Sequence, residues 1–128
     1  MNTKTAEQIA EVVEHARRRP GMYGLSTHGE ATSWIYGIDV GTGLFPGREM
    51  TEWLHSDGDA KWGGRGGAGW DYRVARVALW GQLDPPAGQP VDFTPADEAI
   101  MRNAVLDFAL AWLREPAGSS DQVEPGAP

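Results

Sequence analysis

A histidine and several carboxylates near the middle of the sequence are of types that take part in acid–base chemistry. His55 is preceded by Glu52 and followed by Asp57 and Asp59, and Asp71 lies further along the chain. A histidine flanked by carboxylates can act as a general base. Histidine is also favourable at the C-terminal end of a helix for electrostatic reasons alone. The catalytic residues are therefore undetermined, with His55, Glu52 and Asp71 as candidates.

Aromatic residues close to these groups suggest a ligand pocket. The chain contains 6 tryptophans, and most of them have the spacing of core residues on helices. Trp62 differs because it lies in a polar loop, where an exposed indole would suit stacking on a ligand or partner. Arg65 in the same loop could bind an anionic group. The expected ligand-binding residues are Tyr23, Trp53, Trp62, Arg65 and Trp70.

The loop over residues 56–69, SDGDAKWGGRGGAG, is rich in glycine. Its GGRGGAG run lacks the Gly-Lys-Ser/Thr ending of a phosphate-binding P-loop. It also follows a polar stretch, whereas the glycine-rich loop of a dinucleotide site follows a strand. Two interpretations remain: a solvated connector, or a lid that closes over a ligand and bounds its pocket.

The sequence offers no pattern typical of a metal or cofactor site. It contains no cysteine, and no pair among its 3 histidines has the i, i+4 spacing of a helical metal site. We expect His15 to lie on a solvated charged helix face and His28 to act in helix capping. A metal site would need His55, Asp57 and Asp59 together. We therefore predict no metal and no cofactor.

Charge and hydropathy exclude further classes of function. The formal net charge is −7, which disfavours a nucleic-acid-binding surface and suits a basic partner. No apolar run approaches the roughly 20 residues of a membrane span. The N-terminal MNTKTAEQ is polar and unlike a signal peptide. The sequence thus predicts a soluble cytoplasmic protein with a protein partner or small-molecule ligand, without nucleic acid or membrane.

Apolar periodicity predicts the elements that position these residues. Helical spacing indicates helices over residues 5–19, 27–41, 46–55 and 94–114. Residues 70–83 fit either a helix or a strand. Residues 116–128 are poor in apolar residues and are expected to form a disordered acidic tail. The expected fold is mainly α: a single helical domain over residues 1–115, built as a bundle of about five helices with a Gly-rich loop.

The run RRRPGMYG, residues 17–24, has a structural and a functional interpretation. Arginines suit the C-terminal end of a helix, and Pro20 disfavours helical angles in the residue before it. Met22 and Tyr23 would then fold back beneath the helix and fill the core. In the alternative, the three arginines converge on a cleft and form part of a site.

This run also resembles segments of known families. One is the RPGMY-G segment of the ATPase domain of type II topoisomerases, but the following TSWIYGIDVG lacks that family's Glu-x-x-x-Asn arrangement. A closer resemblance is to small, uncharacterised bacterial proteins with an RPGMY…AGW pattern, some of them immunity-like. Ile38 departs from that pattern, which has Tyr there. The matching residues are Arg19, Pro20, Gly21, Met22, Tyr23, Gly37, Trp53, Ala68, Gly69, Trp70 and Asp71.

Two functions follow as expectations. The first is a small soluble binding or interaction protein, immunity-like or accessory, without catalytic activity. The alternative is a small-molecule enzyme or ligand carrier of a biosynthetic pathway, with an aromatic pocket bounded by the 56–69 loop.

Overall fold

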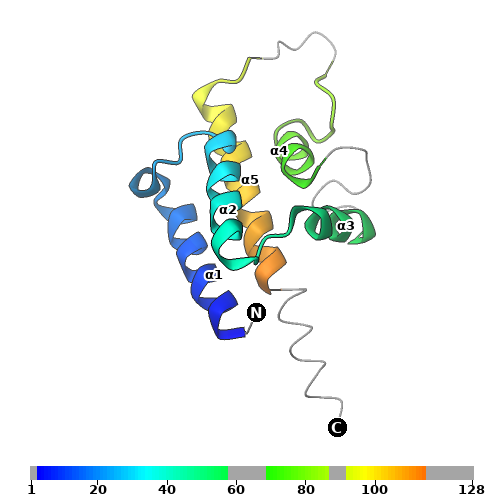
Figure 1. Ribbon diagram of the computed structural model, residues 1–128. Helices are drawn as coiled ribbons and strands as arrows, with labels where there is room; N and C mark the ends of the chain where they lie inside the picture. Colours follow the sequence, from blue (N-terminus) through cyan, green and yellow to red (C-terminus); the bar gives the residue numbers. More distant parts are fainter. Residues whose placement is uncertain (1–2, 58–68, 87–91, 115–128) are drawn as a thin grey trace.

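The computed structural model describes residues 3–57, 69–86 and 92–114. Within these ranges the chain forms five α-helices and one short 3-10 helix, η1, and no strand (Figure 1). The predicted mainly α fold is confirmed, and the segment over residues 70–83, which fitted either a helix or a strand, forms a helix over Trp70–Trp80. The elements are α1 (Thr3–Arg18), η1 (Pro20–Tyr23), α2 (His28–Thr42), α3 (Gly47–Asp57), α4 (Trp70–Trp80) and α5 (Pro95–Arg114).

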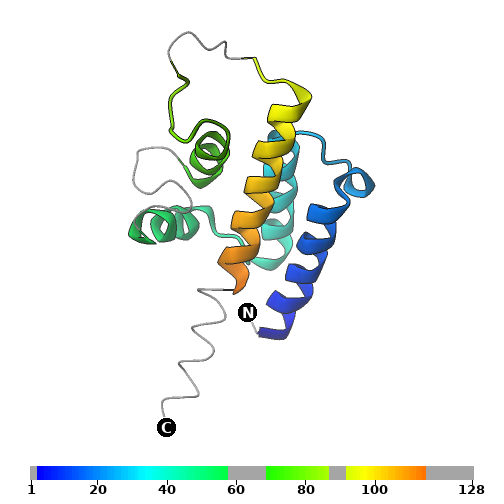
Figure 2. The ribbon, with the colours of Figure 1, turned by 180° about the vertical axis from the view of Figure 1, so that it is seen from behind.

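Helix α5 is the centre of the fold. It packs against α1, α2 and α4, and Figures 1 and 2 show it between α1 and α2 on one side and α3 and α4 on the other. A helix covered on several sides must be apolar over most of its circumference. The buried residues of α5 meet this requirement: Met101, Val105, Leu106, Phe108, Ala109 and Leu113.

Aromatic side chains fix α3 and α4 onto α5. The ring of Phe108 stacks on that of Trp70, with centroids 5.3 Å apart, and lies 5.4 Å from that of Trp53. Trp53 also contacts Trp112 edge to face, and the indole N–H of Trp112 donates to the Leu44 carbonyl at 2.8 Å. These contacts hold the connection before α3 as well as the helix itself.

Local signals in the sequence set the helix boundaries. Thr27 and Glu30 form the expected capping box at the start of α2, with Glu30 N–H donating to Thr27 Oγ1 at 3.1 Å. Thr94 and Asp97 exchange equivalent bonds before α5. Gly43 ends α2 with φ +70°, a left-handed conformation that glycine adopts without strain.

The predicted role of Met22 was wrong. Its side chain is 69% exposed and does not fill the core beneath α1. The 3-10 conformation of η1 carries Met22 outward and turns Tyr23 toward the protein, so only the tyrosine packs against the core. Pro20 does follow the end of α1, as expected.

The described residues contain no helix that is long and apolar enough to cross a membrane.

Replacing Phe108 with Ala should lower the free energy of unfolding by about 3–5 kcal/mol, because it empties the position where Trp53 and Trp70 meet α5. Denaturant unfolding monitored by tryptophan fluorescence measures this change. Val40→Ala is the control, because Val40 is 89% exposed, and it should change stability by less than about 0.5 kcal/mol. A loss below about 1 kcal/mol for Phe108→Ala would contradict the central role of this ring.

Candidate functional site

The segment between α1 and α2, residues 20–27, forms a ridge with a fixed backbone. Met22 N–H donates to the Arg19 carbonyl, and Leu25 N–H donates to the Pro20 carbonyl at 3.0 Å. Gly24 closes η1 with φ +71°. Leu25 is buried and anchors the ridge to the core. The RPGMYG run is therefore a defined turn, and its backbone geometry depends on the proline and on Gly24.

Tyr23 joins the ridge to the helices on both sides of it. Its hydroxyl lies 2.7 Å from Nδ1 of His15, and its ring meets the Trp34 ring edge to face at 5.4 Å. His15 was expected to be solvated, and this prediction was wrong, because the half-buried imidazole is hydrogen-bonded to Tyr23. The three rings fix the direction in which the ridge leaves α1.

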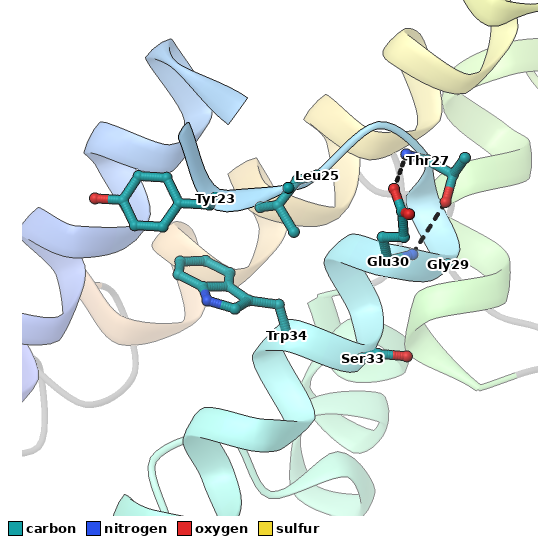
Figure 3. Close-up of a pocket in the computed structure, with 8 residues that line it drawn as sticks. Tyr23, Leu25, Thr27, Gly29, Glu30, Ser33 and Trp34 are labelled. Carbon is teal, nitrogen blue, oxygen red and sulfur yellow. Dashed lines mark hydrogen bonds between the residues drawn. The ribbon is translucent and has the colours of Figure 1, made fainter. Parts of the chain in front are cut away.

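One side of the ridge borders a shallow hollow of about 730 Å³, the aromatic hollow (Figure 3). Tyr23 and Trp34 form its apolar wall, and Glu30 lies at the opposite edge. The Glu30 carboxylate already accepts from the backbone N–H groups of Ser26 and Thr27. The hollow is lined by Tyr23, Gly24, Leu25, Thr27, Gly29, Glu30, Ser33 and Trp34.

The other side of the ridge borders a more enclosed groove of about 550 Å³, the charged groove. It lies between the ridge and the first turns of α5, so segments about 70 residues apart form its two walls. Its surface is mainly apolar, with Glu98 and Arg102 as its ionisable groups. The lining residues are Pro20, Gly21, Leu25, Ser26, Thr27, Phe93, Pro95, Glu98 and Arg102.

Glu98 ties α5 to the start of α2. Its Oε1 accepts from the His28 backbone N–H at 3.0 Å and lies 2.7 Å from His28 Nδ1. Both side chains are largely buried, with 22% of His28 and 19% of Glu98 exposed. The capping role expected of His28 is thus performed by Thr27, and His28 instead links two helix N-termini.

Arg102 lies one helical turn beyond Glu98. Its Nε and Nη2 both donate to Oδ1 of Asn103, at 3.1 and 3.0 Å. No ion pair joins Arg102 to a carboxylate within residues 3–57, 69–86 and 92–114. Its guanidinium is therefore a positive charge at the groove whose hydrogen bonds, among the described residues, go to a neutral amide.

The aromatic residues predicted to form a pocket are distributed over two places. Trp53 and Trp70 both pack on Phe108 in the core, and Trp70 is 1% exposed. Tyr23 contacts His15 and Trp34 instead, so the structure does not bring it to the two tryptophans. The ligand-binding role of these residues stays a prediction.

Trp62, Arg65 and the rest of the 58–68 stretch lie outside the described residues, as do residues 115–128. The predicted lid and the predicted tail therefore stay predictions.

The three catalytic candidates do not form a hydrogen-bonded set in the described structure. Glu52 is 65% exposed and pairs with Arg48 on its own helix at 3.4 Å. His55 has its Nε2 buried without a hydrogen-bond partner among the described residues. Asp71 lies near Tyr36, whose pKa is raised by burial and then by the negative charge of Asp71. A raised pKa makes the Tyr36 hydroxyl a weaker acid, so it stays protonated at neutral pH.

The sequence did not predict the charged groove, because its residues are far apart in the chain. Phe93, Glu98 and Arg102 follow the proline-rich connection, where Glu98 looked like a first-turn acidic residue. In the structure, the pairing of Glu98 with His28 places the start of α5 beside the ridge. Local sequence patterns do not indicate a contact between residues 70 positions apart.

Gly24→Ala should destabilise the protein by about 1–2 kcal/mol, because a Cβ is strained at φ +71° even where space is open around it. Gly21→Ala is the matched control in the same turn, with open space and no positive φ, and should be neutral or slightly stabilising. Thermal unfolding of both variants checks this. Equal losses would show that the ridge does not depend on the left-handed residue.

Glu30→Gln should lower the melting temperature at neutral pH but not in acid. Hydrogen bonds from the backbone N–H of Ser26, and then of Thr27, lower the pKa of Glu30 below its ordinary value of 4.5. A lowered pKa in the folded state gives stability that is present above pH 4.5 and is lost as pH falls through the folded value. Melting curves across this range test the prediction, with Glu11→Gln on exposed α1 surface as the control. A gap that persists in strong acid would contradict it.

Within the described residues, no group of three or more His, Cys, Asp or Glu side chains could hold a metal ion. Comparisons with models of protein families, with curated proteins and with solved structures found no match to this chain. The features that remain to guide a functional assignment are the ridge and the two depressions beside it.

Proposed function

We propose that this chain is a small binding protein, accessory or immunity-like, that docks a protein partner on the ridge formed by residues 20–27. The observation that carries the proposal is the 69% exposure of Met22 on a turn whose backbone is fixed. A long, flexible apolar side chain presented on a turn of defined geometry suits insertion into a partner.

The surroundings of Met22 support an interface. The aromatic hollow and the charged groove lie on the two sides of the ridge, so a partner that covers Met22 can also fill concave surface. Tyr23, Leu25 and Gly24 hold the turn in one conformation, which lowers the entropy lost on binding. The formal net charge of −7 favours a partner with a basic surface.

The alternative, an enzyme or small-molecule carrier, receives less support from the predicted catalytic residues. Glu52 is engaged with Arg48 at the surface, and no hydrogen bond joins His55 to Glu52 or Asp71 in the described part of the chain. The charged groove is the feature that favours a small-molecule ligand.

Site-specific crosslinking tests the interface. A photoreactive amino acid at position 22, introduced in the cells from which the gene comes, should give a discrete protein adduct. The same group at Val40, which is 89% exposed near the other end of α2, is the control and should not give that adduct.

Competition then identifies the contact. Unlabelled wild-type protein should suppress the adduct, whereas Met22→Asp should compete at least about tenfold less well, since it places a charge in an apolar contact. The variant should melt at the wild-type temperature because the side chain is exposed. If Met22→Asp competes as well as the wild type, the ridge is not the interface.

A further inference from the structure

The charged groove has the form of a small-molecule site. Its volume of about 550 Å³ falls in the range of ligand pockets. Phe93, Pro95, Pro20 and Leu25 supply apolar walls from three separate segments. These walls carry no hydrogen-bonding side chain, so an apolar group placed between them would lose water without losing hydrogen bonds.

The apolar wall at Phe93 is held in place by its neighbours. The Phe93 ring meets the His28 ring edge to face at 5.9 Å and lies 5.9 Å from the Trp80 ring. On the α4 side, the Arg76 guanidinium carbon lies 5.5 Å from its centroid. A ring with fixed contacts of this kind keeps the groove open without a ligand, which lowers the cost of binding.

The two ionisable groups of the groove do not form an ion pair with each other, although their spacing along α5 would allow one. Glu98 and Arg102 are at i, i+4 on α5, the spacing at which a carboxylate and a guanidinium commonly form an ion pair. No such pair forms, because Glu98 turns to His28 and Arg102 turns to Asn103. The groove therefore presents a negative and a positive group side by side.

Each group keeps bonding capacity for a ligand. Both hydrogen bonds to Glu98 go to Oε1, and Oε2 has no hydrogen bond to another described residue. The Nε and Nη2 atoms of Arg102 both donate to one neutral oxygen. A ligand carboxylate could take the place of that oxygen and form stronger, charge-assisted hydrogen bonds. A ligand with an ammonium and a carboxylate a few bonds apart matches this arrangement.

We propose that the charged groove binds a small zwitterion with an apolar side chain, of the class of apolar α-amino acids. Arg102 binds the carboxylate, Glu98 Oε2 binds the ammonium, and the side chain lies against Phe93 and Pro95. A simple carboxylate would leave Glu98 Oε2 unpaired beside it, and a simple amine would leave Arg102 unpaired. The groove adjoins the proposed partner interface and shares ridge residues with it, but Met22 does not line the groove, so the two proposals can be tested separately.

Titration of the full chain with three related probes tests the proposal. Phenylalanine carries both charged groups, 3-phenylpropionate lacks the ammonium, and phenethylamine lacks the carboxylate. Amide chemical shifts of the ¹⁵N-labelled protein should move at Phe93, Glu98 and Arg102 with phenylalanine. Each of the two other probes should bind about tenfold or more weaker, since each lacks one charge-assisted hydrogen bond.

Two substitutions should separate the roles of the charged residues. Arg102→Gln should weaken phenylalanine and 3-phenylpropionate alike, whereas Glu98→Gln should weaken phenylalanine and leave 3-phenylpropionate unchanged or tighter. Gln at position 98 keeps an oxygen that can accept from His28, and melting curves verify that each variant is folded. Arg48→Gln is the control for the loss of one positive charge, because Arg48 is 87% exposed on α3, which supplies no residue to the groove.

The proposal is overturned if phenylalanine moves no groove resonance up to millimolar concentration. It is also overturned if phenylalanine and 3-phenylpropionate bind the wild type equally, or if Arg48→Gln weakens binding as much as Arg102→Gln. Met22→Asp should retain ligand binding, so the failure of the partner interface and the failure of this site give different results.

Discussion

The packing of α3 and α4 on Phe108 is the interaction on which the rest of the fold depends. α5 lies between two pairs of helices, and its aromatic and aliphatic surface packs against both pairs. Since Trp53 and Trp70 meet α5 near its C-terminal half, its N-terminal turns are left to interact with the ridge. The charged groove thus lies at the N-terminal end of α5 because the aromatic core occupies the C-terminal half of that helix.

The surface charges of α1 complement this arrangement. Arg17 pairs with Asp107 at 2.9 Å, and Arg114 lies within ion-pair distance of Glu7 and Glu14. These pairs are partly exposed, so each contributes little to stability, but together they fix how α1 lies along α5. The ridge leaves from the end of α1, and its position over the first turn of α5 follows from that alignment.

Much of the fold could be predicted from the sequence because helix signals are local. The Thr27–Glu30 capping box and the proline before α5 set boundaries to within one or two residues. The site was harder to predict, since a buried residue and a pocket residue can share the same spacing. Trp53 and Trp70 are aromatic residues of the kind that line ligand pockets, yet in the described structure both pack on Phe108. Met22 was misassigned for a related reason: its hydrophobicity indicates burial, whereas the 3-10 geometry of η1 decides its direction.

The bond between His28 and Glu98 spans 70 residues of sequence. The two walls of the groove therefore do not exist in a chain in which α5 has not yet docked. A nascent chain, or one opened by local unfolding at α5, would lack the groove entirely. A ligand could then bind only to chains in which α5 has docked against the ridge. By binding that state, the ligand would also oppose the separation of α5 from the ridge.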